Sequence, residues 1–321
     1  MGNLAPPRQL APDRRLSPRR RLSPARRRMS HRDTLLARLF VLPTVGYIAA
    51  VVGVPVVLAV AYALSDATVA EPHHHFVGAA NFAAVVRDGV FWRALANTVV
   101  FTALTTLVAV VGGTVLARLL RADVVGRWVV RVCVLLPWTT PVTLSAVAWQ
   151  WLFDPVYSPL DWIGRQVGLL GAGDSVNWLG RPGLAAGCVV AVQAWRLTPL
   201  TAVIIMSGLA AIPGSVHEAA RMDGAGPLRR AFWVTVPLTM PVTAVAALFC
   251  AVFSVTDMAV VKILTNGGPT HATEVLASWA FAEGIDGGEL GQGTAVAVFL
   301  LPVLLAAALL ILHAVRRVAP R

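Results

Sequence analysis

Charged side chains are scarce in this sequence. Asp, Glu, Lys and Arg together make up 13% of the 321 residues, about half of the ~25% that soluble domains carry. Only three cysteines are present, Cys133, Cys188 and Cys250. All three fall inside apolar stretches, which fits neither a disulfide framework nor a metal cluster. The shortage of charge favours an integral membrane protein.

Motifs of catalysis are missing as well. The chain contains no nucleophile-elbow pattern, no HExxH and no phosphate-binding GxxxxGK[ST]. The sequence therefore predicts no catalytic residue and no cofactor on this chain, and chemistry on ATP would require another chain. His73, His74 and His75 are consecutive, and neighbours on an extended chain point to opposite sides, so the triplet does not predict a metal site.

Long apolar stretches dominate what is present. A bilayer core of ~30 Å takes about 20 helical residues, and five stretches of that length contain no Asp, Glu, Lys or Arg. A sixth is interrupted only by Arg196. All six are apolar on every side, unlike the amphipathic helices of a soluble bundle. The predicted spans cover residues 39–62, 98–117, 132–153, 184–211, 231–256 and 290–313.

The basic residues predict an orientation and a domain division. With the first 38 residues in the cytoplasm, 21 of the 27 Lys and Arg residues lie on that side and five on the other. The positive-inside rule then predicts that both termini are cytoplasmic. Residues 1–35, rich in Pro and Arg, are expected to be a disordered tail that sets topology beside membrane lipid. Residues 36–93 hold the first span and an outer loop, and residues 94–315 form a five-helix core.

One polar segment separates two spans on the predicted cytoplasmic side. Ser215 with Glu218 three residues later forms a capping-box pattern, which predicts that a short helix begins there. Gly224 predicts the end of this helix because glycine tolerates the left-handed conformation. Pro227 suits the first turn of a second helix that continues into the fifth span. We therefore expect a pair of surface helices over residues 212–232.

This segment also carries a family resemblance. EAA at residues 218–220, then Gly224, then VTVP ending at Pro237 resembles the EAA loop of importer-type ABC permeases, with valines where the family usually has isoleucine and leucine. The stretches LLPWTTP, WQWLFDP, MSGLAAIP and LTNGGPTHATE are similar to the carbohydrate branch of that family, the maltose and glycerol-3-phosphate type. Asn97 and Thr98 would open the second helix. The similarity runs from about residue 36 to 315.

The resemblance implies an all-α, MetI-like permease core with six transmembrane helices and cytoplasmic coupling helices, in a bacterial cytoplasmic membrane. It implies ATP-driven import of a sugar or sugar derivative through a pathway of which this chain forms half. The implied partners are a second homologous permease in a heterodimer, a cytoplasmic ABC ATPase dimer that holds ATP and Mg²⁺, and an extracytoplasmic solute-binding protein. No nucleic acid is expected. The ATPase-coupling residues would be Glu218, Ala219, Ala220, Asp223, Gly224 and Pro237.

Polar and aromatic side chains inside the spans are candidates for the substrate pathway. Arg196 at a helix centre would cost about 2.5–3.5 kcal/mol on insertion scales, so we expect it to face the bundle interior, with Asp257 as a possible partner. Tryptophans can stack on a sugar or anchor the protein at the membrane surface, and packing is the alternative for each polar residue. The candidates are Gln193, Trp195, Arg196, Thr198, Trp149 and Asp257.

Other functions stay open at this point. An ABC permease for a different polar solute would share every pattern above. An ion-coupled secondary transporter would need repeated halves and intramembrane carboxylates, whereas the chain has no convincing repeat and only Asp257 near a span. A membrane anchor whose basic tail binds lipid or nucleic acid is a third possibility.

Overall fold

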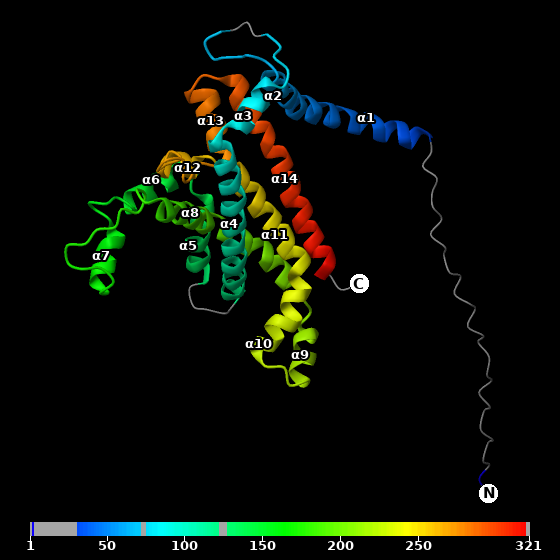
Figure 1. Ribbon diagram of the computed structural model, residues 1–321. Coiled ribbons are helices and arrows are strands. Elements are labelled where there is room, and N and C mark those ends of the chain that lie inside the picture. The colour runs from blue at the N-terminus through cyan, green and yellow to red at the C-terminus, as the bar shows by residue number, and fades with distance from the viewer. Residues whose placement is uncertain (1, 3–30, 72–74, 122–126, 319–321) are drawn as a thin grey trace. The chain divides into compact units, whose positions relative to one another are not determined.

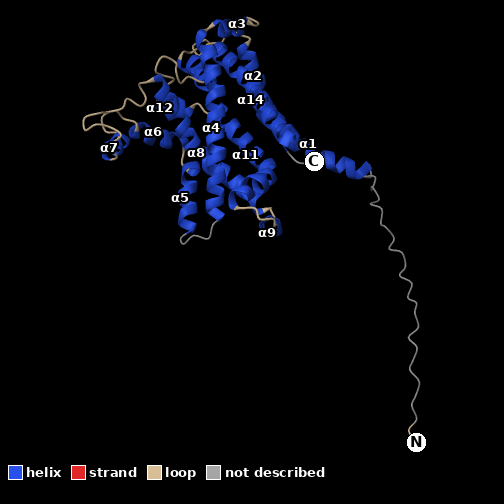
Figure 2. Cartoon of the chain, turned by 60° about the horizontal axis from the view of Figure 1, so that its bottom comes forward, coloured by secondary structure: helices blue, strands red, loops and turns tan. Residues whose placement is uncertain are grey.

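The computed structural model describes residues 2, 31–71, 75–121 and 127–318, in which helices and loops occur without a strand (Figure 2). Most of the predicted tail, together with His73 and His74, lies outside the described residues. The chain divides into two compact units, Met1–Val54 and Pro55–Arg321, which are described in turn.

The first unit contains α1 (His31–Ile48) and the π-helical segment η1 (Ala49–Gly53). α1 begins at His31, so this helix takes in the last residues of the segment 1–35 that was predicted as a tail. Helical structure continues through α2 (Val54–Ala63), and Phe40–Ala63 is apolar enough over 24 residues to cross a membrane. This segment agrees with the first predicted span.

The second unit is a helical bundle with short surface helices at both ends (Figure 1). Its long helices are α4 (Gly89–Arg121), α8 (Pro182–Ala210), α11 (Val236–Thr256) and α14 (Leu290–Val318). Its shorter elements are α3 (Ala80–Arg87), α5 (Arg127–Thr139), α6 (Val142–Leu152), α7 (Pro159–Gln166), α9 (Gly214–Met222), α10 (Pro227–Arg230), η2 (Ala231–Thr235), α12 (Ala259–Leu264), α13 (Leu276–Phe281) and η3 (Ala282–Asp286).

The third predicted span is broken. The described residues hold five helices that could each cross a membrane, and a sixth span forms only if α5 and α6 are taken together. These two helices meet at an angle of 101°. Pro141 lies at the break with an extended ψ of 131°, and proline both lacks the N–H that would continue a helix and disfavours helical geometry in the residue before it. An unbroken helix over residues 132–153 was therefore a wrong prediction.

The start of the second predicted span was also wrong. α4 begins at Gly89 and runs for 33 residues, so Asn97 and Thr98 lie within the helix rather than at its start. The Asp88 carboxylate accepts a hydrogen bond from the backbone N–H of Val90 at 2.8 Å, which satisfies one of the free donors of the first turn. The hydropathy pattern marked only the apolar part of a longer helix.

The central helices α4, α8 and α11 pack against one another, and α14 packs on α11. At Gly113 an added Cβ would lie 2.9 Å from Thr201 Cγ2 and 3.0 Å from the backbone N of Ala202. At Gly208 it would lie 2.9 Å from Val242 Cβ. Close backbone approach at small residues is typical of helix association in membranes, and it holds α8 rigidly between its two neighbours.

Candidate functional site

The predicted pair of short helices, α9 and α10, is present at one end of the bundle, in the segment that connects α8 to α11. α9 begins at Gly214, after Pro213 in an extended conformation, and no side chain caps it. The capping box predicted for Ser215 and Glu218 is therefore wrong. Because Pro213 already sets the start of the helix, Ser215 lies inside the first turn and is not at the N-cap position.

The turn after α9 agrees with the prediction. Gly224 has a φ of +71°, and the N–H of Ala225 donates to the carbonyl of Ala220 at 3.0 Å, the bond that closes a left-handed helix end. An added Cβ at Gly224 would meet nothing within 4 Å, so glycine is needed there for its conformation and not for space. Pro227 occupies the first turn of α10, as predicted.

The surface of this helix pair combines charge with large apolar side chains. Glu218, Ala219 and Asp223 are exposed, and Ala220 is half-buried. Met222 of α9 is 89% exposed, which is unusual for an apolar side chain of this size on a polar surface helix. Trp233 of η2 is 79% exposed and lies at the start of the apolar span Pro227–Thr256. Pro237 differs from the other predicted coupling residues, since it is half-buried in the first turn of α11.

A polar cluster lies inside the bundle, between α4, α8 and α11. Gln193 of α8 is 2% exposed, and its Oε1 accepts hydrogen bonds from Thr105 of α4 at 3.4 Å and from Ser254 of α11 at 3.0 Å. One amide oxygen thus joins the three central helices. The hydroxyl of Thr198 donates to the carbonyl of Ala194 in its own helix at 2.6 Å.

Arg196 and Asp257 form an ion pair, as the sequence suggested. Their side chains are 12% and 6% exposed. The second carboxylate oxygen of Asp257 accepts from the backbone N–H of Val260 at 3.0 Å, so this residue also caps α12. Arg196 Nε is buried and makes no hydrogen bond with the described residues. Arg196 is the middle residue of α8 (Pro182–Ala210) and Asp257 follows the last residue of α11, so the pair is separated from α9 by half the length of α8.

Two predicted tryptophans come together beside this pair. The rings of Trp149 and Trp195 meet edge to face with centroids 5.4 Å apart, and Trp149 stacks on Phe153 at 5.4 Å. Trp195 is 39% exposed and therefore presents part of its ring at the surface, whereas Trp151 is 61% exposed and lies outside this aromatic group. α6 and α8 thus bring Trp149 and Trp195 together although 46 positions separate them in the sequence.

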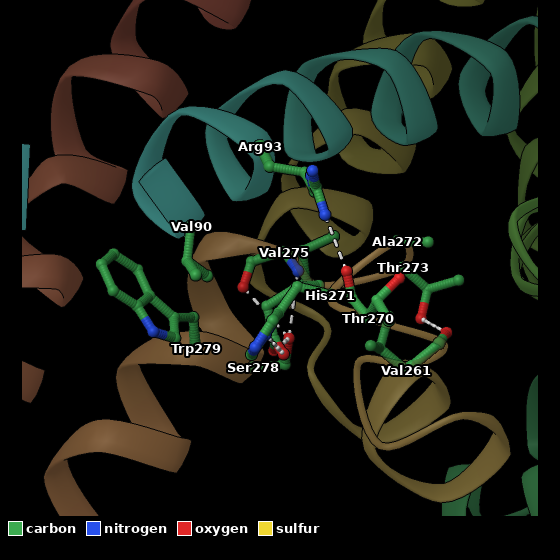
Figure 3. Close-up of polar contacts among 12 residues, drawn as sticks. Val90, Arg93, Val261, Thr270, His271, Ala272, Thr273, Val275, Ser278 and Trp279 are labelled. Carbon is green, nitrogen blue, oxygen red and sulfur yellow. Dashed lines mark hydrogen bonds and ion pairs between the residues drawn. The ribbon is translucent and has the colours of Figure 1, made fainter. Parts of the chain in front are cut away.

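Sequence reasoning missed a second polar network, in the loop between α12 and α13 (Figure 3). Asn97 of α4 donates to the carbonyls of Ala272 and Glu274 at 3.0 and 2.8 Å, and Arg93 donates to the carbonyl of Thr270 at 2.7 Å. The Thr98 hydroxyl accepts from the N–H of Leu276 at 2.9 Å. One face of α4 thereby holds the whole loop.

Glu274 is the buried centre of that loop. It is 5% exposed, and its carboxylate accepts from the Ser278 hydroxyl at 2.5 Å and lies 3.4 Å from His271 Nδ1. Gly267, with a φ of +80°, approaches the same carboxylate so closely that a Cβ would overlap it. The sequence does contain a signal for this network, because Glu274 stands directly before the apolar run VLASWAF. A carboxylate buried next to such a run needs hydrogen-bonding or charged partners.

Comparisons with known proteins give the family of the chain. The trehalose/maltose transport system permease protein MalF of Thermococcus litoralis is 30% identical over 270 residues, which cover 84% of this chain and 90% of that protein. The sulfoquinovosyl glycerol transport system permease protein SmoG of Agrobacterium fabrum is 31% identical over 223 residues, covering 70% and 71%.

The fold has a close match among solved structures. A bacterial ABC transporter involved in the import of the acidic polysaccharide alginate matches with a TM-score of 0.73 at 21% identity, covering 90% of this chain and 97% of that chain. This match confirms the predicted all-α importer-permease fold. The family described as binding-protein-dependent transport system inner membrane component matches residues 109–320. The chain therefore belongs to the binding-protein-dependent transport system inner membrane components, the permease subunits of ABC importers.

Proposed function

We propose that this permease subunit forms half of the translocation pathway of an importer for a sugar or sugar derivative in a bacterial cytoplasmic membrane. The substrate class is supported by its relatives, which carry the names of trehalose/maltose and sulfoquinovosyl glycerol permeases. A second, homologous permease would complete the pathway, and an extracytoplasmic solute-binding protein would deliver the substrate.

Both termini and the α9–α10 pair lie on the cytoplasmic side in this proposal, in line with the bias of basic residues. An ABC ATPase dimer carrying ATP and Mg²⁺ binds the α9–α10 surface, and its closure moves α8 and α11. The observation that carries the proposal is the exposed surface itself. Met222 is 89% exposed on the same short helix as the exposed Glu218 and next to the exposed Asp223 in the sequence, a combination of apolar and charged groups suited to a protein interface.

The proposed substrate pathway passes the polar and aromatic groups of α6 and α8. Trp195 and Trp149 offer ring faces on which a sugar can stack. Arg196, Gln193 and Thr198 offer hydrogen-bonding groups along α8, and Asp257 keeps the arginine charge paired inside the bundle. Trp195 has the exposure needed for direct contact, so we assign it the first contact with substrate and assign Arg196 a positioning role.

Substitutions in the helix pair test the proposal. Glu218→Ala removes a charge from the proposed interface, and Gly224→Asp adds a second carboxylate next to Asp223 at a left-handed position that glycine occupies without strain. Both should abolish ATP-coupled uptake while the subunit still inserts and still binds its partner permease. Gly226→Ala is the matched control, because Gly226 has a φ of −64° and no atom within 4 Å of an added Cβ. Normal uptake by both test variants would contradict the proposal.

A further inference from the structure

A basic cavity of about 400 Å³ lies between the end of α4 and the α9–α10 region. Four elements contribute to it, namely α4, α8, α9 and η2. The cavity shares α9 with the exposed surface proposed to bind the ATPase but is lined by none of the proposed coupling residues, and none of its lining residues belongs to the polar cluster around Arg196. Its lining residues are Arg118, Arg121, Leu209, His217 and Thr235.

The cavity holds an excess of positive charge. Arg118 and Arg121 are three positions apart on α4 and therefore share one face of the helix, where like charges repel. Neither arginine forms an ion pair with a carboxylate in the part of the chain that the structure describes. Arg121 donates to the carbonyl of Leu209 at 2.6 Å, which positions its guanidinium against α8 but leaves its charge unneutralised.

His217 adds a hydrogen-bond donor to the cavity. His217 is half-buried in α9, and an imidazole donates at least one N–H in either charge state. The cavity is open, since Arg118 and Arg121 are both exposed. The neighbouring Glu218 projects about 100° further round the helix than His217 and is not among the lining residues. Thr235 is buried in η2, and its hydroxyl donates to the carbonyl of Arg230 at 3.2 Å, so it shapes the cavity without adding a free donor.

We propose that this cavity binds a phosphate-type oxyanion, which in the membrane is the headgroup phosphate of an acidic phospholipid. Two guanidinium groups on one helix face match the oxygens of a phosphate through charge-assisted hydrogen bonds. The position agrees with this ligand, because Arg121 is the last residue of α4 and Leu209 lies in the last turn of α8. Basic pockets between transmembrane helices at the cytoplasmic surface are suited to phospholipid headgroups.

The bound anion has a mechanical consequence. It joins α4 of the central bundle to His217 of α9, two elements that the described residues connect by no direct hydrogen bond. The link stiffens the proposed ATPase-binding helix against the bundle, so that movement of α9 is passed on to α8 and α4 together. This consequence, unlike the binding itself, rests on the proposed function and orientation.

Binding is tested first, without transport. The full-length subunit in complex with its partners is purified, and native mass spectrometry counts retained phosphatidylglycerol for the wild type and for Arg118→Gln. Arg118 is exposed and forms no hydrogen bond or ion pair with another described residue. Its removal should weaken retention about tenfold, the effect of losing a hydrogen bond to a charged group. Arg181→Gln, the same charge change on an exposed residue before α8, should leave retention unchanged. Equal retention in Arg118→Gln and the wild type overturns lipid binding.

A second arm distinguishes the source of the phosphate. In phosphatidylcholine vesicles, inorganic phosphate is titrated while thermal stability is followed. Stabilisation that Arg118→Gln abolishes supports a free phosphate ligand, whereas stabilisation by phosphatidylglycerol alone supports the lipid. If neither anion stabilises the wild type, the cavity is no oxyanion site. Uptake by the wild type and Arg118→Gln is measured last, so that a loss of anion binding and a loss of transport are recorded as separate results.

Discussion

Replacing Asp257 with Asn should destabilise the bundle strongly while α12 keeps its cap. The Asp257 carboxylate pairs with Arg196 through one oxygen and accepts the Val260 N–H at 3.0 Å through the other. Asparagine retains a carbonyl oxygen that can cap the helix but carries no charge. The substitution therefore isolates the contribution of the ion pair.

The expected magnitude follows from burial. The two side chains are 12% and 6% exposed, and Arg196 Nε has no other hydrogen-bond partner among the described residues. Removing one member of a buried pair costs about 3–5 kcal/mol, because the other charge is left uncompensated. The unfolding equilibrium would then shift by roughly a hundredfold to a few thousandfold. Arg196→Met combined with Asp257→Asn removes both charges and should recover most of the loss.

Equilibrium unfolding in mixed micelles of the wild type, both single variants and the double variant completes a double-mutant cycle. Because either single substitution leaves one charge buried and costs about 3–5 kcal/mol while the double variant loses much less, the coupling energy should reach or exceed about 3 kcal/mol, the upper end of the range for residues in contact. If Asp257→Asn were as stable as the wild type, the buried ion pair would be refuted. Uptake adds a second reading. A folded double variant without uptake would show that transport depends on the arginine itself, and recovered uptake would limit the pair to bundle stability.

Two further predictions concern the loops. Gly267→Ala should lower the midpoint temperature of thermal unfolding more than Gly288→Ala. Both glycines have φ near +80°, but only at Gly267 would an added Cβ overlap the Glu274 carboxylate. Equal midpoint temperatures for the two variants would refute the clash. The backbone N–H of His75 holds the pKa of Asp66 below its ordinary value of 3.8, so this contact stabilises the folded loop above that pH and is lost as the pH falls through the lower folded-state pKa. Amide-exchange protection at His75, corrected for intrinsic rates, should fall on acidification in the wild type and be low at every pH in Asp66→Ala, which has no acceptor at this position. Equal protection in the two proteins would contradict the prediction.

Local chemistry explains which parts of the fold could be predicted. Membrane character and the approximate spans follow from hydropathy, which depends only on the length and composition of each segment. Gly224 and Pro227 behave as predicted, because a left-handed helix end and a first-turn proline are local backbone preferences. The errors at Ser215 and at the start of α4 arose where neighbouring residues, Pro213 and Asp88, set the helix start instead.

Contacts between helices required the tertiary structure. The sequence by itself determined that the chain crosses a membrane in about six apolar segments and carries a surface helix pair between two of them. Only the folded bundle decided that Arg196 pairs with Asp257, that Gln193 joins three helices, and that Glu274 is buried under α4. Helices that are apolar on every side contain no periodic signal of which face turns inward, so their rotation and register are decided by packing.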